Sequence, residues 1–167
     1  MLAKVYSASV QGLEAQQVTI EVNSSRGIRF VLVGLPDNAV KESHERITAA
    51  MENSGFPFPC KQITVNLAPA NMRKVGSGFD LPIAIGILAT AEKVDSTRLD
   101  KIMMVGELSL DGSLQPICGA LPIAIKARAL VGVILATIKN KDVLPLFPEL
   151  KSQLELLVEE QELSSTL

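Results

Sequence analysis

The chain has 167 residues, of which 47% are hydrophobic and 20% are charged, with 16 lysines and arginines against 18 aspartates and glutamates. One domain is the default at this length, and the apolar content excludes an intrinsically disordered chain. The slightly acidic balance excludes a domain that is basic throughout, so nucleic-acid binding would need a local patch of cations.

Several classes of protein and of site are excluded by what the chain lacks. The longest apolar run, Leu81–Ala91, is far shorter than the roughly 18 residues of a membrane-spanning helix. The N-terminus shows no secretory signal, so we expect a cytoplasmic location. Cys60 and Cys118 form no C-x-x-C pair, and we expect two buried free thiols. His44 is the only histidine, which excludes zinc sites built on two histidines, and we expect no metal site.

Three β-strands are expected in the first third of the chain. Apolar and polar residues alternate over Val18–Val22 and again over Ile28–Leu32, with a turn between them. A further strand covers about Leu2–Val10. The pattern predicts a three-stranded antiparallel meander.

A helix is expected from Asp37, its predicted N-cap, to about Asn53, with Gly55 as the C-terminal stop. Its outer face carries two i, i+4 ion pairs, Lys41 with Glu45 and Glu42 with Arg46. Its inner face carries residues at helical spacing, namely Val40, His44, Ile47 and Met51. We therefore expect His44 to be a half-buried packing residue.

The middle of the chain predicts a strand, a long loop and a buried helix. Ile63–Leu67 alternates like a strand, and residues 68–78 form the loop. The next helix begins between Gly78 and Asp80, because Pro82 is best tolerated in a first turn. This helix is apolar on nearly every face, which is typical of a central buried helix.

The second half predicts a further run of short elements. They are strands over 102–108, 114–117, 131–138 and 154–158, a helix over about 121–130, and a short apolar turn or helix over 143–146. Strands and helices do not alternate strictly, so we expect an α+β fold in which a mixed sheet has its helices largely on one side.

The loop before the buried helix carries residues that could bind an anion. Gly76, Ser77 and Gly78 precede a helix N-terminus, where backbone N–H groups attract negative charge, and Arg73 and Lys74 add two cations. A tight turn that needs backbone freedom is the alternative. None of the 11 glycines is followed by lysine, which excludes a P-loop in this chain.

Several motifs resemble the N-terminal domain of the ComM-type (YifB-like) magnesium-chelatase-like AAA+ ATPases over about residues 1–160. They are LPDNAVKES at 35–43, ITVNLAPA at 63–70, RK at 73–74, FDLPIAIG at 79–86 and VGEL at 105–108. In that family the domain resembles the ribosomal protein S5 domain 2-type fold, shared with the Lon protease catalytic domain and the RadA C-terminal domain. The resemblance implies one domain over 1–160, with 161–167 as the truncated start of a linker to a missing AAA+ module.

The relationship to Lon tests whether this chain is an enzyme. Lon-type peptidases use a serine nucleophile and a lysine base, and alignment on the shared motifs places Gly78 and Leu121 at those two positions. Ser77 lies one residue away, and neither Lys74 nor Lys126 stands where the family geometry needs the base. We therefore expect no catalytic residue in this chain.

Two acidic residues stand inside otherwise apolar motifs. We expect Asp80 to cap the N-terminus of the buried helix and Glu107 to bond backbone in a neighbouring loop. Metal ligation by the pair is possible in principle, but nothing in the sequence fixes their separation.

The resemblance implies a non-catalytic accessory and assembly domain of a ring-forming AAA+ motor, with ATP and Mg²⁺ held by the missing module. The whole protein would resemble an ATP-driven DNA helicase for branch migration in natural transformation. The candidate residues for contact with DNA or a partner are Arg73, Lys74, Gly76, Ser77 and Gly78 first, then Arg26, Arg29 and Lys61. There are three alternatives. The cations are solvated loop residues that bind nothing, the domain is a degenerate Lon-like Ser/Lys hydrolase, or it is a pure protein-interaction module.

Overall fold

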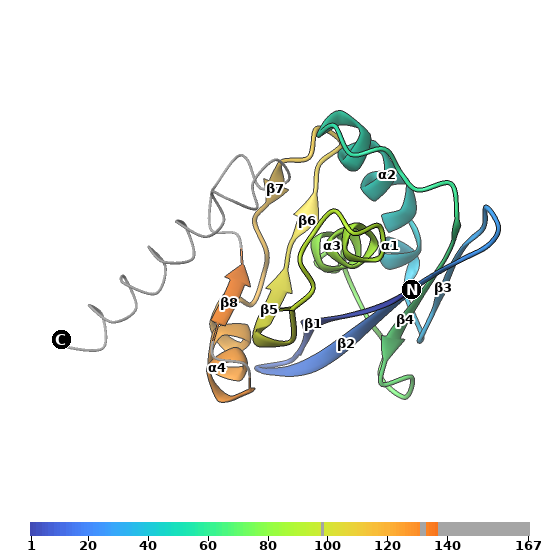
Figure 1. Ribbon diagram of the computed structural model, residues 1–167. Coiled ribbons are helices and arrows are strands. Elements are labelled where there is room, and N and C mark those ends of the chain that lie inside the picture. The colour runs from blue at the N-terminus through green and yellow to red at the C-terminus, as the bar shows by residue number, and fades with distance from the viewer. Residues whose placement is uncertain (98, 131–132, 137–167) are drawn as a thin grey trace.

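The computed structural model describes residues 1–97, 99–130 and 133–136 (Figure 1). A six-stranded sheet forms its centre, in the order β3 (Phe30–Val33), β4 (Gln62–Ala68), β2 (Glu14–Ser25), β1 (Leu2–Gln11), β5 (Ile102–Val105) and β8 (Val133–Ala136). Only β2 runs antiparallel to its neighbours; the other strands of the sheet are parallel to one another. The expected mixed sheet of an α+β fold is confirmed.

The long β1–β2 hairpin forms the middle of the sheet. Its register pairs Leu2 with Asn23 at one end and Gln11 with Glu14 at the other. Gly12 closes the turn with a φ of 63°, a conformation that glycine adopts without steric cost.

The predicted meander is wrong in its third strand, because β4 lies between β2 and β3. β3 pairs in parallel with β4, from Phe30 opposite Ile63 to Val33 opposite Asn66. Two parallel strands need a crossover connection, and here the helices α1 (Asn38–Lys41) and α2 (Ser43–Asn53) provide it. Ile28, expected to begin the strand, is 86% exposed in the preceding loop. Alternation identifies the faces of a strand but does not identify its neighbours.

The helix expected from Asp37 is divided at Glu42 into α1 and α2. Asp37 caps it as predicted, because its Oδ1 accepts a hydrogen bond of 2.8 Å from Val40 N. The expected pair of Glu42 with Arg46 is present at 3.9 Å, whereas Glu45 contacts His44 at 3.1 Å and forms no ion pair with Lys41.

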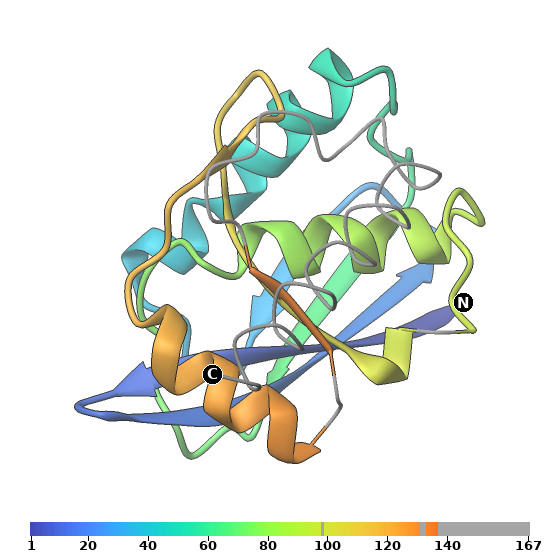
Figure 2. The same ribbon diagram turned by 90° about the vertical axis from the view of Figure 1, so that its left-hand side faces the viewer.

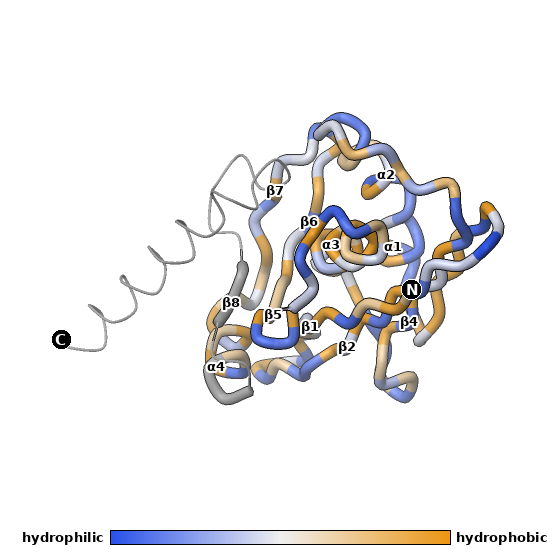
Figure 3. The backbone as a smooth tube through the Cα atoms, in the orientation of Figure 1, coloured by the Kyte–Doolittle hydropathy of each residue, from blue (hydrophilic) through white to orange (hydrophobic). Residues whose placement is uncertain are grey.

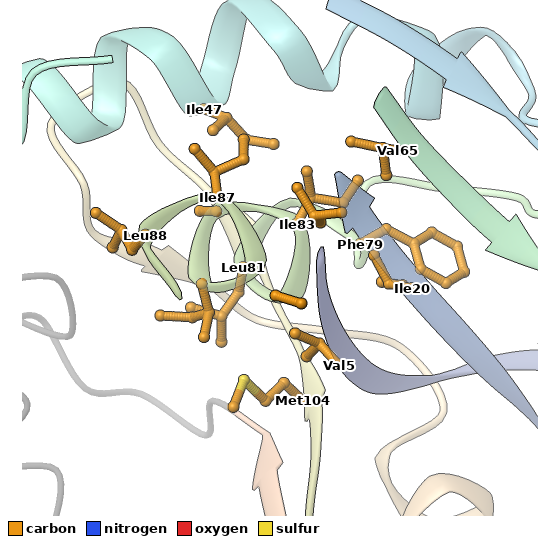
Figure 4. Packing of buried hydrophobic residues seen from close by; sticks show 14 of the residues in the cluster. Val5, Ile20, Ile47, Val65, Phe79, Leu81, Ile83, Ile87, Leu88 and Met104 are labelled. Carbon is orange, nitrogen blue, oxygen red and sulfur yellow. The ribbon is translucent and has the colours of Figure 1, made fainter. Parts of the chain in front are cut away.

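The central buried helix is confirmed as α3 (Asp80–Thr90), in which every residue is buried. It lies between the sheet on one side and α2 on the other, as the views in Figures 1 and 2 show. Its apolar side chains contact the core from both layers (Figure 4), including Val5, Ile20, Ile47, Val65 and Met104. Burying one such side chain contributes about 1.5–3 kcal/mol.

One of the described helices covers the opposite face of the sheet, and the expectation of helices largely on one side is confirmed. α4 (Ala120–Leu130) packs Ile123 and Ala127 against Ala8, Ala15 and Met103. Ala8 and Val5 lie on opposite faces of β1, because side chains alternate along a strand. α4 connects the parallel strands β5 and β8 and is a second crossover helix.

The remaining described elements are short. A 3₁₀ turn, η1 (Leu99–Lys101), precedes β5, and the predicted strand over 102–108 is divided at Gly106 into β5 and β6 (Glu107–Leu108). β6 pairs with β7 (Leu114–Gln115) in a two-stranded hairpin. Within the described residues, no helix is long and apolar enough to span a membrane. The predictions for residues 137–167, including the strand over 154–158 and the domain limit at 160, lie outside the described residues.

Candidate functional site

The carboxyl ends of β3, β4 and β5 meet at one end of the sheet, where α3 begins. This is the position at which open sheets with parallel strands commonly bind ligands. Residues 69–79, here called the carboxyl-end loop, connect β4 to α3 and contain the first group of predicted site residues. Figure 3 shows the apolar tube of α3 and the more polar segments around it.

The carboxyl-end loop is held to the segment after β3 by backbone hydrogen bonds. Lys74 N donates to Leu35 O at 3.1 Å, and Asp37 N donates to Lys74 O at 3.0 Å. The second carboxylate oxygen of Asp37 accepts from Gly76 N at 3.1 Å. Asp37 therefore caps α1 and anchors the loop at the same time.

Lys74 is fully buried, which contradicts its predicted role in binding phosphate. Its Nζ donates a hydrogen bond to the carbonyl of Pro69. Within the described residues, no carboxylate lies within ion-pair distance of this ammonium. Burial lowers the pKa of Lys74, because the charged form loses its hydration. The side chain fixes the loop from inside and is not available to a partner.

The other residues of the predicted anion site are in part committed to contacts within the fold. The Ser77 hydroxyl donates to the Glu107 carboxylate on β6. The expected backbone bond of Glu107 is thus replaced by a side-chain bond. Gly78 O accepts from Gly106 N at 2.8 Å, and a Cβ at Gly78 would lie 3.1 Å from Val105 Cγ1. Arg73 is exposed.

Asp80 forms a buried ion pair and does not cap α3, whose cap residue is Phe79. Arg46 Nε donates to its Oδ2 at 2.6 Å, and a second guanidinium nitrogen donates to Oδ1 at 2.9 Å. Leu108 N lies 3.3 Å from Oδ2 as a further donor. The ion pair connects α2 to the first turn of α3 and to β6.

The pKa values of this pair reflect both burial and charge. Burial raises the pKa of Asp80, and its hydrogen bonds and charge interaction with Arg46 offset part of that rise. The hydrogen bond to Asp80 in turn raises the pKa of Arg46. Sequence reasoning treated Arg46 only as a surface partner of Glu42. A carboxylate at the start of a wholly apolar helix was the signal that a buried cation is required.

The second group of predicted residues lies at the other end of β4. Its members are exposed cations, here called the amino-end cluster: Arg26, Arg29 and Lys61. Ile63 N donates to Arg29 O at 2.8 Å, and Ser25 pairs with Gln62, so the two segments lie side by side. β4 covers seven residues, which places roughly 20 Å between this cluster and the carboxyl-end loop.

The amino-end cluster adjoins a group of aromatic rings. The His44 ring lies 4.5 Å from that of Phe30 and 5.5 Å from that of Phe58, measured between centroids. The His44 side chain is 35% exposed, which confirms a half-buried packing histidine. Within the described residues, no carboxylate forms an ion pair with any of the three cations of the cluster.

The structure corrects the expectation for the thiols. Cys60 and Cys118 are free, as predicted, but both are exposed. Among the described residues, no group of three or more histidine, cysteine, aspartate or glutamate side chains could hold a metal ion.

Comparison with known proteins identifies relatives over most of the chain. The family model for subunit ChlI of magnesium chelatase matches residues 20–138. The competence protein ComM of Haemophilus influenzae is 48% identical over 128 residues, which is 76% of this chain and 25% of ComM. The YifB protein of Salmonella typhimurium is 44% identical over 81% of this chain and 27% of its own length. YifB of Escherichia coli is 40% identical over 84% and 28%.

The chain therefore spans about a quarter of the length of these relatives. The match includes the segments that build the carboxyl-end loop and α3. The chain belongs to the magnesium-chelatase-like ComM/YifB family.

Proposed function

We propose that this chain is a non-catalytic accessory domain of a magnesium-chelatase-like AAA+ ATPase and that it contacts DNA through the amino-end cluster. The observation that carries the DNA contact is the grouping of Arg26, Arg29 and Lys61, exposed and without a carboxylate ion partner in the described residues. Clustered arginines and lysines neutralise backbone phosphates and release condensed counterions. The proposed contact is therefore the second predicted group of residues and not the first, because Lys74 of the first group is buried.

The assignment of an accessory role rests on the chemistry that these residues lack. No glycine of the chain is followed by lysine, so these residues do not fit a nucleotide phosphate in the manner of a P-loop. ATP and Mg²⁺ are therefore assigned to the remaining three-quarters of the parent protein. The name of the Haemophilus relative links that parent to competence, and we extend to it a helicase role in branch migration, a ring assembly and a cytoplasmic location.

A degenerate Lon-like hydrolase is the second candidate, and the contacts of its two positions argue against it. Ser77, the nearest hydroxyl to the nucleophile position, donates to a carboxylate and not to a lysine. Leu121, at the base position, is 72% exposed and carries no titratable group. Ser77 therefore lacks the adjacent lysine base that a Lon-type Ser/Lys dyad requires.

The DNA contact is tested by the salt dependence of binding. Fluorescence anisotropy with single-stranded and branched DNA at about 50 and 200 mM salt should give binding that weakens steeply with salt. Replacing all three cations, as Arg26→Glu, Arg29→Glu and Lys61→Glu, should weaken binding and make the slope of log K against log salt shallower by about 2 for a single strand.

A charge-matched variant is the control. Lys41→Glu, Lys93→Glu and Lys126→Glu make the same change in net charge at positions outside both groups of predicted contacts. This variant should keep most of the slope. If both variants lose the same amount of slope, the salt dependence reflects net charge alone and not a contact by the amino-end cluster. Absence of binding at both salt concentrations would favour a pure protein-interaction module.

A further inference from the structure

Two exposed apolar side chains lie near the edge of the sheet, one in the segment after β3 and one in the carboxyl-end loop. Leu35 is 55% exposed and Val75 is 62% exposed. Arg73, also exposed, lies in the same loop and forms no ion pair within the described residues. These three residues, here called the edge patch, belong to two segments that are far apart in the sequence.

The backbone places the edge patch on one fixed surface. Pro36 and Lys74 form a parallel β-bridge, with Lys74 hydrogen-bonded to the residues on both sides of Pro36. This register sets Leu35 beside Arg73 and Asp37 beside Val75. Because side chains alternate along extended backbone, the inward direction of Lys74 sends its two neighbours outward.

The fold holds Leu35 in this position against its backbone preference. Its φ is 57°, in the left-handed region, which is sterically unfavourable for an L-residue with a Cβ. The preceding Gly34 is required, because a Cβ there would lie 2.2 Å from Leu67 O. Such strained backbone conformations persist where many surrounding contacts hold them. They are concentrated at binding sites. Leu35 nevertheless remains 55% exposed.

We propose that the edge patch is a docking surface for a protein partner, namely the part of the parent polypeptide that this chain does not include. The proposal rests on the accessory role stated above. The matched relatives extend over about four times the length covered here, so in those proteins a large partner surface is joined to the domain. The partner surface offers an apolar pocket for Leu35 and Val75.

Charge specifies the partner further. Arg73 has no carboxylate of its own domain within ion-pair distance in the described residues, and the nearby Asp37 carboxylate is occupied by Val40 N and Gly76 N. The partner therefore supplies an aspartate or glutamate next to the apolar pocket. Arginine is enriched at protein interfaces and at their energetic centres, which favours Arg73 as the polar contact of this surface.

The docking surface is tested with the rest of a relative as the probe. The segment of Haemophilus influenzae ComM outside the part matched by this chain is produced separately, its cooperative unfolding is verified by circular dichroism, and its binding to this chain is measured by calorimetry. The wild-type chain should bind it. The variant with Leu35→Asn and Val75→Thr should bind at least roughly tenfold more weakly, because anchor residues dominate such interfaces.

The substitutions are chosen to spare the fold. Asparagine adopts the left-handed conformation more readily than leucine, and threonine has nearly the shape of valine. A purely structural role for Leu35 predicts an altered midpoint of urea unfolding with unchanged binding. Leu13→Asn is the matched control, because Leu13 is 94% exposed on the β1–β2 turn and should not affect binding.

Three results would overturn the proposal: no binding by the wild-type chain, equal weakening by Leu13→Asn, or full binding by the double variant. Arg73→Glu should weaken docking roughly tenfold or more at low salt. Measurements of DNA binding distinguish a failure of this docking proposal from a failure of the proposed DNA contact. The edge-patch double variant should keep the wild-type salt slope on DNA, and the variant of the amino-end cluster should keep docking.

Discussion

The two ends of β4 both carry cations in the sequence, but the fold treats them in opposite ways. At the carboxyl end, Lys74 turns inward to a backbone carbonyl and Asp80 is paired with Arg46. At the amino end, Arg26, Arg29 and Lys61 stay exposed. The difference shows that charge in a loop indicates neither accessibility nor function until the fold determines which side of the chain faces solvent.

The difference follows from the connections that each end makes. The carboxyl end joins β4 to a helix that is buried on all sides, so its loop must cross the top of the core and its polar groups need partners inside the protein. The amino end joins a surface loop to an edge region of the sheet, where water can satisfy the cations. The buried polar groups of the carboxyl end therefore contribute to stability, whereas the three cations of the amino end remain exposed to solvent.

The largest expected effect is at the buried ion pair. Arg46→Met leaves the Asp80 carboxylate buried without its cation and should lower the free energy of unfolding by about 3–5 kcal/mol at neutral pH. The loss should be smaller at acidic pH, where protonation removes the charge of Asp80. Urea unfolding followed by circular dichroism measures it. Arg29→Met is the control for the amino end, and an equal loss there would contradict the comparison.

A pH-dependent effect is expected at Lys74. Because burial lowers its pKa in the folded state, the unfolded chain binds more protons between that value and the ordinary 10.5. The contribution of Lys74 to the free energy of unfolding therefore rises with pH across this window. Lys74→Met removes this rise.

The measurement compares unfolding free energies of the two proteins from neutral pH upward. The stability of Lys74→Met relative to wild type should decline as pH increases through the window. Lys93 is exposed, and the control variant Lys93→Met should follow the wild-type curve of unfolding free energy against pH. A constant difference between Lys74→Met and wild type would show that the buried ammonium does not lose its proton in the folded state over this range.

A moderate effect is expected for the contact of Ser77 with Glu107, which joins the carboxyl-end loop to β6. A double-mutant cycle with Ser77→Ala and Glu107→Ala should give a coupling of about 1.5 kcal/mol, typical of a hydrogen bond to a charged group. Additive losses would mean that the two side chains stabilise the fold independently.

Much of the fold could be predicted from local sequence patterns. The cap at Asp37, the buried α3 and the stripe that includes His44 follow from spacing along one helix, which a sequence displays directly. The insertion of β4 between β2 and β3 could not, because strand order depends on contacts between distant segments. The position of α4 on the second face depends in the same way on how β5 and β8 pair.

The candidate site was predictable in its residues but not in their roles. The motif around Asp80 indicated a special position, yet only the structure shows that Arg46, 34 residues away, is its partner. Arg73 and Lys74 are adjacent in the sequence and point in opposite directions, because the parallel bridge to Pro36 imposes alternation on the loop. The different roles of these two neighbouring cations therefore depend on a contact between distant segments, which no local sequence pattern displays.

The smallest effect is expected where the cations are free. Each of Arg26→Glu, Arg29→Glu and Lys61→Glu should change the free energy of unfolding by less than about 0.5 kcal/mol, because exposed side chains without partners add little to stability. Urea unfolding at low and high salt measures this. A loss above about 1 kcal/mol in any of the three, roughly twice the usual effect of a surface substitution, would mean that the cations of the amino end also stabilise the fold. If the loss is absent while the salt slope of DNA binding changes, the cluster serves binding alone, since a residue that affects binding but not stability makes its contacts outside its own domain.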